Sequence, residues 1–174
     1  NNFLYKKTIL LANPQPNFFA NLPVCPLSGY FFLEATAYRE KCFSSFVFDS
    51  DTKYTGEWLN GTFNGQGIYS FSGDGLYFGG FQGKDFHGVG TSIHNDAKYV
   101  GEYQNGDRHG QGTQNFPGGS TYVGGWKDDV FHGHGSYIGP DAGGEYTGSY
   151  KNGERHGKGS QTLYKSGTYV GDFK

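Results

Sequence analysis

Residues Tyr99–Gly112 read Tyr-Val-Gly-Glu-Tyr-Gln-Asn-Gly-Asp-Arg-His-Gly-Gln-Gly, and versions of this stretch recur along the chain. The tyrosine that begins it returns at steps of 22 to 24 residues, as Tyr54, Tyr77, Tyr99, Tyr122, Tyr146 and Tyr169. A fixed period this short is typical of an array of repeats. The architecture is therefore expected to be that of one small unit, stacked several times.

Each repeat begins with the pattern of a β-strand. A glycine follows the repeated tyrosine after two residues and an aromatic residue follows after two more, as in Tyr99-x-Gly101-x-Tyr103. Side chains two apart lie on one face of a strand, so the packed side is expected to carry a ring, a notch and a second ring. We expect the strand glycines, Gly133 among them, to be seats for rings of the neighbouring unit, because a missing Cβ leaves room for a ring.

A polar connection follows each of these strands and predicts a tight hairpin turn. The connections are Asn60-Gly61, Gln82-Gly83, Asn105-Gly106, Asp128-Asp129 and Asn152-Gly153. The returning strand carries a second pair of glycines two apart, as in Phe131-His132-Gly133-x-Gly135. Each repeat is therefore predicted to be one β-hairpin.

The pattern divides the chain into an array and two leading segments. The array is expected at 54-174, with repeats at 54-76, 77-98, 99-121, 122-145 and 146-168 and a partial repeat at 169-174. Residues 41-53 match the second strand of a repeat and are predicted to form a degenerate half repeat that caps one end. Residues 1-40 follow no repeat and are interpreted as an irregular N-terminal arm that lies against the sheet or a partner; a transit peptide is the alternative.

This pattern resembles the MORN repeat (membrane occupation and recognition nexus), most fully at Tyr99–Gly112 and also at Tyr54–Trp58 and Asn64–Gly67. The resemblance covers Tyr54 to Lys174. It implies an all-β fold, a single-layer twisted antiparallel sheet of consecutive β-hairpins with a groove along one side. Junctophilins, radial spoke head proteins and plant phosphatidylinositol phosphate kinases belong to this family, and their arrays are not catalytic.

The sequence departs from the family pattern at an acidic position. Gly80, Gly125 and Ser149 stand where Glu57 and Glu102 do in other repeats. This variation argues against one common binding role for the acidic side chain.

Charge and composition exclude several classes of protein. The formal net charge is −2, and residues 51–174 carry ten basic and thirteen acidic side chains without a Lys/Arg cluster. Nucleic acid is therefore excluded as a partner, and direct lipid binding is disfavoured. No apolar run approaches the roughly 20 residues of a membrane-spanning helix. Cys25 and Cys42 lie outside the recognisable repeats without metal-ligand spacing, so we expect reduced thiols inside a cell.

The histidines and Gly-x-Gly pieces do not indicate a cofactor site. Equivalent imidazoles of successive hairpins, those of His87, His109, His132 and His156, are expected about 9.6 Å apart, too far to share one zinc ion. Each imidazole is expected instead to cap its own hairpin or to hydrogen-bond the next. The Gly-x-Gly pieces recur inside strands with no helix after them, unlike phosphate-binding loops. We predict no catalytic residue, cofactor, metal or small-molecule substrate.

The remaining candidate for function is the surface formed by the rings. Tyrosine and tryptophan provide large contact areas at low entropic cost, so this stripe is expected both to pack the repeats together and to line a groove for a helix or an extended peptide. The candidate partner-binding residues are Tyr54, Trp58, Tyr77, Phe81, Tyr99, Tyr103, Tyr122, Trp126, Tyr146 and Tyr150.

The chain is therefore interpreted as a non-catalytic protein–protein interaction scaffold within a larger assembly. The resemblance favours an intracellular setting in the cytoskeleton, such as the axoneme of a cilium, with an organelle-bound assembly, mitochondria included, as the alternative. Two other functions remain open. One is a tether that brings the array to a membrane, and the other is a regulatory module of a larger enzyme, such as a lipid kinase or a methyltransferase, that continues beyond Lys174.

Overall fold

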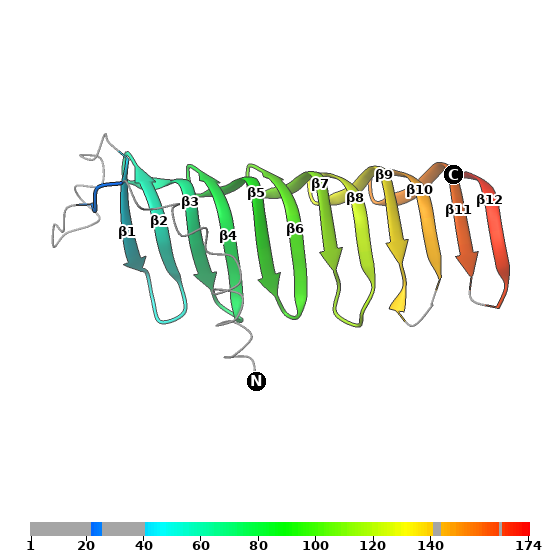
Figure 1. Ribbon diagram of the computed structural model, residues 1–174, viewed down its shortest axis with the longest axis horizontal. Helices are drawn as coiled ribbons and strands as arrows, with labels where there is room; N and C mark the ends of the chain where they lie inside the picture. The colour runs from blue at the N-terminus through cyan, green and yellow to red at the C-terminus, as the bar shows by residue number, and fades with distance from the viewer. Residues whose placement is uncertain (1–21, 26–40, 141–143, 164) are drawn as a thin grey trace.

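The computed structural model describes residues 22–25, 41–140, 144–163 and 165–174, and these form one open sheet (Figure 1). Twelve strands lie in the sheet in the order of the sequence, and each pairs antiparallel with its neighbour along the chain. The described residues contain no helix, so the predicted all-β fold of consecutive hairpins is confirmed. Most of the N-terminal arm, residues 1–21 and 26–40, lies outside the described residues, and the expectations for it remain predictions.

The strands are β1 (Cys42–Val47), β2 (Lys53–Leu59), β3 (Thr62–Phe71), β4 (Gly75–Gln82), β5 (Asp85–His94), β6 (Ala97–Gln104), β7 (Asp107–Asn115), β8 (Thr121–Lys127), β9 (Val130–Ile138), β10 (Glu145–Lys151), β11 (Glu154–Leu163) and β12 (Gly167–Phe173). The repeated tyrosines lie on the even-numbered strands from β2 to β12. β1 lies in the stretch expected to form a half repeat and pairs with β2.

Two-residue turns join each tyrosine strand to the next strand, and both turn residues have positive φ. In the first of them Asn60 has φ 51° and Gly61 has φ 69°. Positive φ at both positions is the type I′ geometry, whose twist matches that of the strands. In the second repeat the turn is Gly83-Lys84, with φ 63° and 85°, rather than the predicted Gln82-Gly83. The prediction was one residue early there because it matched a polar residue followed by glycine. The spacing of the other repeats, with turn residues six and seven places after the tyrosine, gives Gly83-Lys84.

The repeated tyrosine of each hairpin lies flat on two glycines of that same hairpin. A Cβ added to Gly67 would lie 2.5 Å from a ring carbon of Tyr54, and one added to Gly56 would lie 2.5 Å from its hydroxyl. The hydroxyl donates a hydrogen bond to the carbonyl of Glu57, three residues on, over 2.7 Å. The same bond recurs in the other repeats, including Tyr77 to Gly80 and Tyr122 to Gly125. The seats predicted for rings of a neighbouring unit therefore hold the hairpin's own ring.

Neighbouring hairpins are joined by contacts between rings and by turn hydrogen bonds. Each buried tyrosine meets the second ring of the next repeat nearly edge-on, as Tyr99 meets Trp126 at 5.3 Å between centroids. Tyr122 meets Tyr150 in the same way, also at 5.3 Å. On the turn side, the amide of Asp129 donates to the carbonyl of Arg108 in the preceding hairpin at 3.1 Å. Stability is therefore transmitted from one repeat to the next, as expected of a repeat array.

Gly133 does not seat a ring, contrary to the expectation from the sequence. Its φ is +72°, and a Cβ added there would find nothing within 4 Å. The ring of Tyr122 instead lies on Gly124 and Gly135, two residues further along β9. The glycine at 133 is needed for the backbone, because the left-handed region is strained for residues with a side chain.

This difference predicts distinct effects for two glycines only two residues apart. Gly135→Ala should cost about 2–3 kcal/mol, because its Cβ would lie 2.7 Å from ring carbons of Tyr122. Gly133→Ala should cost about 1 kcal/mol from backbone strain alone. Asn tolerates positive φ, so Gly133→Asn should recover most of that loss, whereas Gly135→Asn should not. Urea unfolding followed by circular dichroism measures all four variants; equal losses at both sites would contradict the assignment.

The outer edge of β1 is covered by residues 22–25, which a disulfide ties to it. Cys25 and Cys42 are bonded, with their Cα atoms 5.0 Å apart, and both side chains are buried. The amide of Phe43 donates to the carbonyl of Pro23 at 2.9 Å, and the amide of Cys25 donates to the carbonyl of Phe43 at 3.0 Å. The expectation that both cysteines are reduced thiols is therefore wrong. It failed because their proximity depends on the path of the chain outside the repeats.

Reduction of this disulfide should loosen the β1 end selectively. The loop that the Cys25–Cys42 disulfide closes has a length that contributes about 3 kcal/mol to the free energy of unfolding in the chain-entropy treatment. Residues 22–25 should therefore separate from β1 when the disulfide is reduced. Hydrogen exchange of the Phe43 amide should accelerate on addition of dithiothreitol, while amides in β8 and β9 remain unchanged. Unchanged protection of Phe43 in the reduced protein would show that the backbone bonds alone hold this edge.

Candidate functional site

One face of the sheet carries the repeated tyrosines, and we call it the aromatic face. The strand register places one residue of each strand in a continuous row across it. In strand order the row is Phe46, Tyr54, Tyr69, Tyr77, Ser92, Tyr99, Gln114, Tyr122, Tyr137, Tyr146, Gln161 and Tyr169. Tyrosines of the first strand of each hairpin thus alternate with a variable residue of the second strand.

The ten candidate groove residues form the core of this face and do not line its surface. Their exposed fractions are 0–6%. Each tyrosine packs on glycines below it, and in three repeats a phenylalanine stacks directly over it, as Phe131 does on Tyr122 at 3.8 Å between centroids. These rings do lie together on one face, as the sequence analysis expected. Because they are buried, they do not offer a partner the direct contact that was proposed for them. The reason is that inter-repeat packing uses both rings of every repeat.

The accessible part of the aromatic face is made by other rings, which are partly buried. They are Phe46, Tyr69, Phe71, Phe86, Phe116, Phe131, Tyr137 and Phe173. Phe48, at the end of β1, is 42% exposed and meets Phe46 at 4.7 Å between centroids. Of these residues the sequence analysis names Phe131, as part of a returning strand, and it assigns none of them to the groove. The signal was present, because the second-strand residue paired with the repeated tyrosine varies between repeats whereas the tyrosine does not.

Most of these rings gather in two groups, with Phe86 on β5 between the groups and Phe173 on β12 beyond them. The first group lies on β1 to β3 and the loops that follow β1, with Phe46, Phe48, Tyr69 and Phe71. The second lies on β7 to β9, with Phe116, Phe131 and Tyr137. Between them the row carries Ser92, which is partly exposed, and Gln114, which is buried and accepts a hydrogen bond from Arg108. The surface therefore offers two apolar sites with hydrogen-bonding groups between them.

Arg108 lies in the polar middle of the aromatic face. It replaces the phenylalanine that stacks on the tyrosine in other repeats, and its guanidinium lies 4.3 Å from the centre of the Trp126 ring. Its Nε donates to Asp129 Oδ1 at 2.7 Å and its Nη1 to Gln114 Oε1 at 3.0 Å. The cation–π and ion-pair contacts join two hairpins, and they direct most of its donors inward.

The acidic side chain of the repeat makes a hydrogen bond within its own hairpin. Glu102 Oε1 accepts a hydrogen bond from the Gln111 amide at 2.8 Å, where the returning strand bulges. In the second and fourth repeats glycine stands at this position, and the space beside Gly88 and Gly133 is open. The variation of this acidic position between repeats is consistent with such a role, in which the side chain bonds a backbone amide of its own hairpin.

The imidazoles do not make the hydrogen bonds expected of them. His109 Nδ1 lies 3.5 Å from Asp128 Oδ1 without hydrogen-bond geometry. In the described part of the chain the buried Nδ1 atoms of His87 and His132 have no hydrogen-bond partner. No group of three His, Cys, Asp or Glu side chains that could hold a metal occurs among the residues described.

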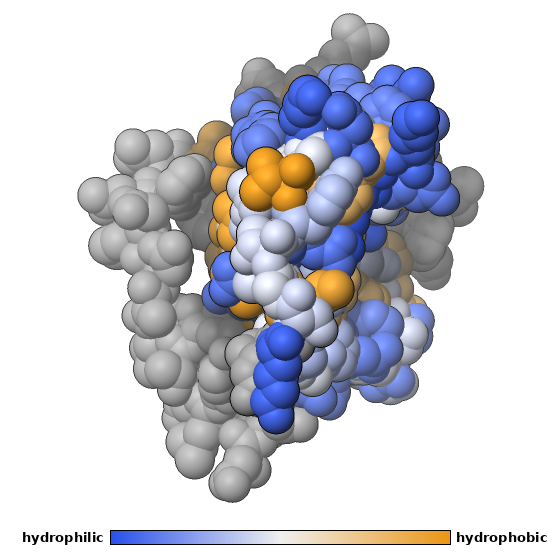
Figure 2. Space-filling view, turned by 90° about the vertical axis from the view of Figure 1, so that its right-hand side faces the viewer, coloured by the Kyte–Doolittle hydropathy of each residue, from blue (hydrophilic) through white to orange (hydrophobic). Residues whose placement is uncertain are grey.

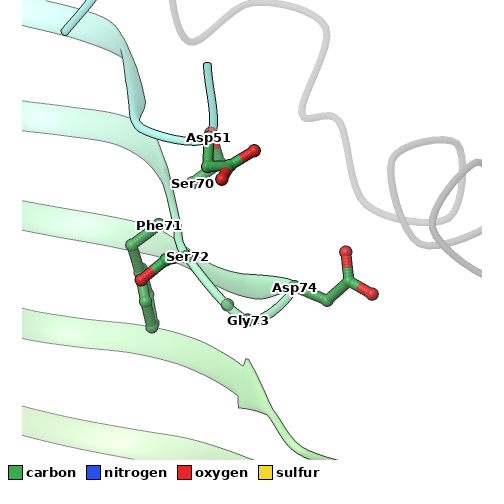
Figure 3. A pocket seen from close by; sticks show the side chains of 7 residues that line it. Asp51, Ser70, Phe71, Ser72, Gly73 and Asp74 are labelled. Carbon is green, nitrogen blue, oxygen red and sulfur yellow. The ribbon is translucent and has the colours of Figure 1, made fainter. Parts of the chain in front are cut away.

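A shallow pocket of about 310 Å³ lies at the edge of the sheet between the loop before β2 and the loop between β3 and β4 (Figure 3). It is lined by Asp51, Ser70, Phe71, Ser72, Gly73, Asp74 and Gly75. The lining holds no histidine, cysteine or lysine that could serve as base or nucleophile beside its serines. The carboxylates of Asp51 and Asp74 and the two serines make this lining polar.

The β12 end of the face differs from the rest. Tyr169 is 54% exposed, whereas the five equivalent tyrosines are 0–1% exposed. Its hydroxyl still donates to the carbonyl of Asp172, at 3.2 Å. Figure 2 looks at this end, where hydrophobic residues reach the surface among hydrophilic ones. The difference shows that burial of each tyrosine depends on the strands that follow it in the sheet.

The fold and this face define a β-repeat scaffold whose surface is suited to binding. The family model of the MORN repeat matches residues 54–75, 99–121, 122–143 and 146–169, more than half of the chain, so the protein belongs to the MORN-repeat family. Comparison with curated proteins gave no match. Residues 77–98, between two matched segments, form the same hairpin from β4 and β5. MORN repeats are protein- or membrane-binding modules, and they suggest no catalytic role.

No helix among the described residues is long and apolar enough to cross a membrane.

Burial of the tyrosine hydroxyls predicts a pH limit for the fold. Burial raises the pKa of Tyr103, which also donates to Ser92 Oγ at 2.8 Å, to about 12. Burial also raises the pKa of Tyr150 to about 12, and raises those of Tyr54, Tyr77 and Tyr122. An unfolded tyrosine loses its proton near pH 10. Between about pH 10 and 12 the folded chain therefore holds protons that the unfolded chain has lost.

The contribution of the buried tyrosines to the free energy of unfolding should therefore be fully present below pH 10 and should fall as the pH rises towards 12. Titration by tyrosinate absorbance, with circular dichroism on the same sample, tests this. The absorbance of the buried tyrosines should rise together with loss of the β-sheet signal. Ionisation of all tyrosines near pH 10 in a sheet that remains folded would contradict the burial argument.

Proposed function

We propose that this protein is a non-catalytic scaffold whose aromatic face binds a segment of a partner protein. The observation that supports the proposal best is the pair of partly exposed ring groups, on β1 to β3 and on β7 to β9. Aromatic residues are enriched among those that dominate the energy of protein interfaces. Membership of the MORN-repeat family supports a binding role in general.

The spacing of the two ring groups limits the shape of the partner. β3 and β9 are six strands apart, which corresponds to about 29 Å at ~4.8 Å per strand. A helix spans that distance with about 19 residues and an extended segment with about nine. The expected ligand therefore has apolar side chains at both ends and polar groups between them, which face Ser92.

The cellular setting is part of the proposal and rests on the resemblance alone. A cytoskeletal assembly such as the axoneme is the setting we favour. A membrane tether is less favoured, because the guanidinium groups of Arg108 and Arg155 pack on the rings of Trp126 and Tyr146 rather than forming a basic patch. Phospholipid headgroups would need such a patch.

The proposal is tested by substitution of surface rings that the core does not need. Phe71→Ser and Tyr137→Ser each remove one accessible ring from a different group, and the double variant should reduce recovery of a crosslinked partner from the native source about tenfold or more. Val47→Ser, which changes a 60% exposed residue of β1, is the matched control and should keep recovery. Trp126→Ala would be unsuitable, since that residue is 4% exposed and its loss would open the core.

Three outcomes separate the possibilities. Loss with the double variant alone supports partner binding on the aromatic face. Equal recovery with all variants, each shown to be folded by circular dichroism, would overturn it. Flotation of the protein with anionic liposomes at moderate salt would favour the membrane tether instead.

A further inference from the structure

The N-terminal stretch Phe3–Leu11 has the pattern that the two ring groups of the aromatic face require of a ligand. It reads Phe-Leu-Tyr-Lys-Lys-Thr-Ile-Leu-Leu, with three apolar or aromatic residues at each end and three polar residues between them. Nine residues are also the length of an extended segment that reaches from β3 to β9, at about 3.3 Å per residue. The stretch lies outside the described residues, so its pattern is known from the sequence.

Alternation along this stretch separates its side chains into two sets. Residues two apart share one side of an extended segment, and on one side these are Phe3, Tyr5, Lys7, Ile9 and Leu11. The other side has two leucines around a lysine and a threonine. The first side therefore offers two rings, a lysine and two aliphatic side chains, in an order suited to two apolar sites with a polar region between them.

The point of attachment fixes the direction in which this stretch can cross the aromatic face. Leu22 lies beside the outer edge of β1, where Val24 pairs with Phe43. The chain from Leu22 to Leu11 reaches at most about 40 Å when fully extended. At ~4.8 Å per strand, β3 lies about 14 Å from this edge and β9 about 43 Å from it. Leu11 can therefore reach β3 but not β9.

We propose that Phe3–Leu11 docks on the aromatic face of its own chain, with Leu11 over β3, and competes there with the partner segment. The inference rests on the proposed function, because it assigns one surface to both ligands. It adds that the chain carries its own competitor for that surface.

This direction brings apolar side chains over the exposed rings. With Leu11 over the ring group of β1 to β3, a rise of about 3.3 Å per residue places Ile9 between β4 and β5, near Phe86. The same rise places Phe3 between β8 and β9, where Phe131 lies partly buried over its tyrosine. Both ends of the docked stretch therefore remove apolar surface from water.

The charge of the aromatic face suits the lysine in the middle of the stretch. Lys7 falls over β6, next to the turn end of β7, where the guanidinium of Arg108 lies 2.7 Å from Asp129. Desolvation and the carboxylates of Asp129 and Asp128 raise the pKa of Asp107 beside them. Three carboxylates against one guanidinium give this end a formal charge of −2. The stretch itself has two lysines and no acidic residue, so the charges are complementary.

Attachment to the same chain makes weak docking sufficient. A segment joined to its site by a short connection has an effective concentration on the order of 1 mM. An intrinsic Kd of about 0.1 mM would then leave about nine chains in ten self-occupied. A partner would bind such a chain about tenfold more weakly than it binds an open face.

Photocrosslinking in the purified full chain tests the docked arrangement. The photoreactive residue p-benzoylphenylalanine, placed at Phe3, should crosslink to β7–β9, and placed at Leu11 it should crosslink to β1–β3. Mass spectrometry of the digested protein identifies the joined peptides. The matched control is the same residue at Leu4, on the other side of the stretch, which should give neither crosslink. The yields should not change on dilution, because the contact lies within one chain.

A labelled peptide of residues 1–12 tests the competition without any partner protein. By fluorescence anisotropy it should bind the full-length Phe3→Ser/Ile9→Ser variant about tenfold more tightly than the unmodified chain, whose own stretch occupies the face. The matched control Leu4→Ser/Leu10→Ser should bind the peptide as weakly as the unmodified chain does. Adding Phe71→Ser and Tyr137→Ser to the first variant should weaken its peptide binding about tenfold. Circular dichroism verifies that each variant is folded.

The outcomes separate this inference from the proposed function. Absence of both crosslinks, crosslinks that decline on dilution, or equal peptide affinity for the unmodified chain and Phe3→Ser/Ile9→Ser would overturn self-docking. The proposed function stands in those cases if Phe71→Ser/Tyr137→Ser still reduces recovery of the partner. Both crosslinks together with partner recovery that is indifferent to Phe71→Ser/Tyr137→Ser would support self-docking and reject the scaffold proposal.

Discussion

The whole structure depends on a tyrosine ring that lies on two bare glycines and donates its hydroxyl to a carbonyl three residues on. In the second repeat, Tyr77 covers Gly79 and Gly90 and bonds Gly80. The glycines let the ring approach the backbone closely, and the hydrogen bond removes the cost of burying the hydroxyl. A single-layer sheet has no second layer to cover its apolar face. Here the rings themselves provide that layer, which explains why a chain with 31 glycines can fold.

This arrangement separates the functions of the two faces. On the aromatic face the innermost rings are used up by packing within and between repeats, so only the outer ones, such as Tyr69 and Tyr137, remain for a partner. On the opposite face Val100 and Val123 are not needed by the core and stay exposed. A repeat that must bury its own hydrophobic residues on one side therefore leaves only its outer rings accessible there, and a largely polar surface with a few valines on the other side.

Most of the fold could be predicted, and part of the candidate site could not. The hairpins follow from side chains two apart and from paired turn residues such as Asn105-Gly106, which are local patterns. The turn at Gly83-Lys84 was placed one residue early, because the prediction matched a polar residue followed by glycine and not the spacing from Tyr77. The rings chosen as a groove were correct as a stripe but buried, because a pattern of aromatic residues does not distinguish a core from a surface.

The amino-acid sequence by itself determined the period, the hairpins and the order of the strands, because each depends on contacts between residues close in the chain. The tertiary structure alone decided which glycines seat a ring. It also decided that Cys25 reaches Cys42. These features depend on distances between separate strands and on backbone φ angles. Side-chain spacing along one strand does not carry that information.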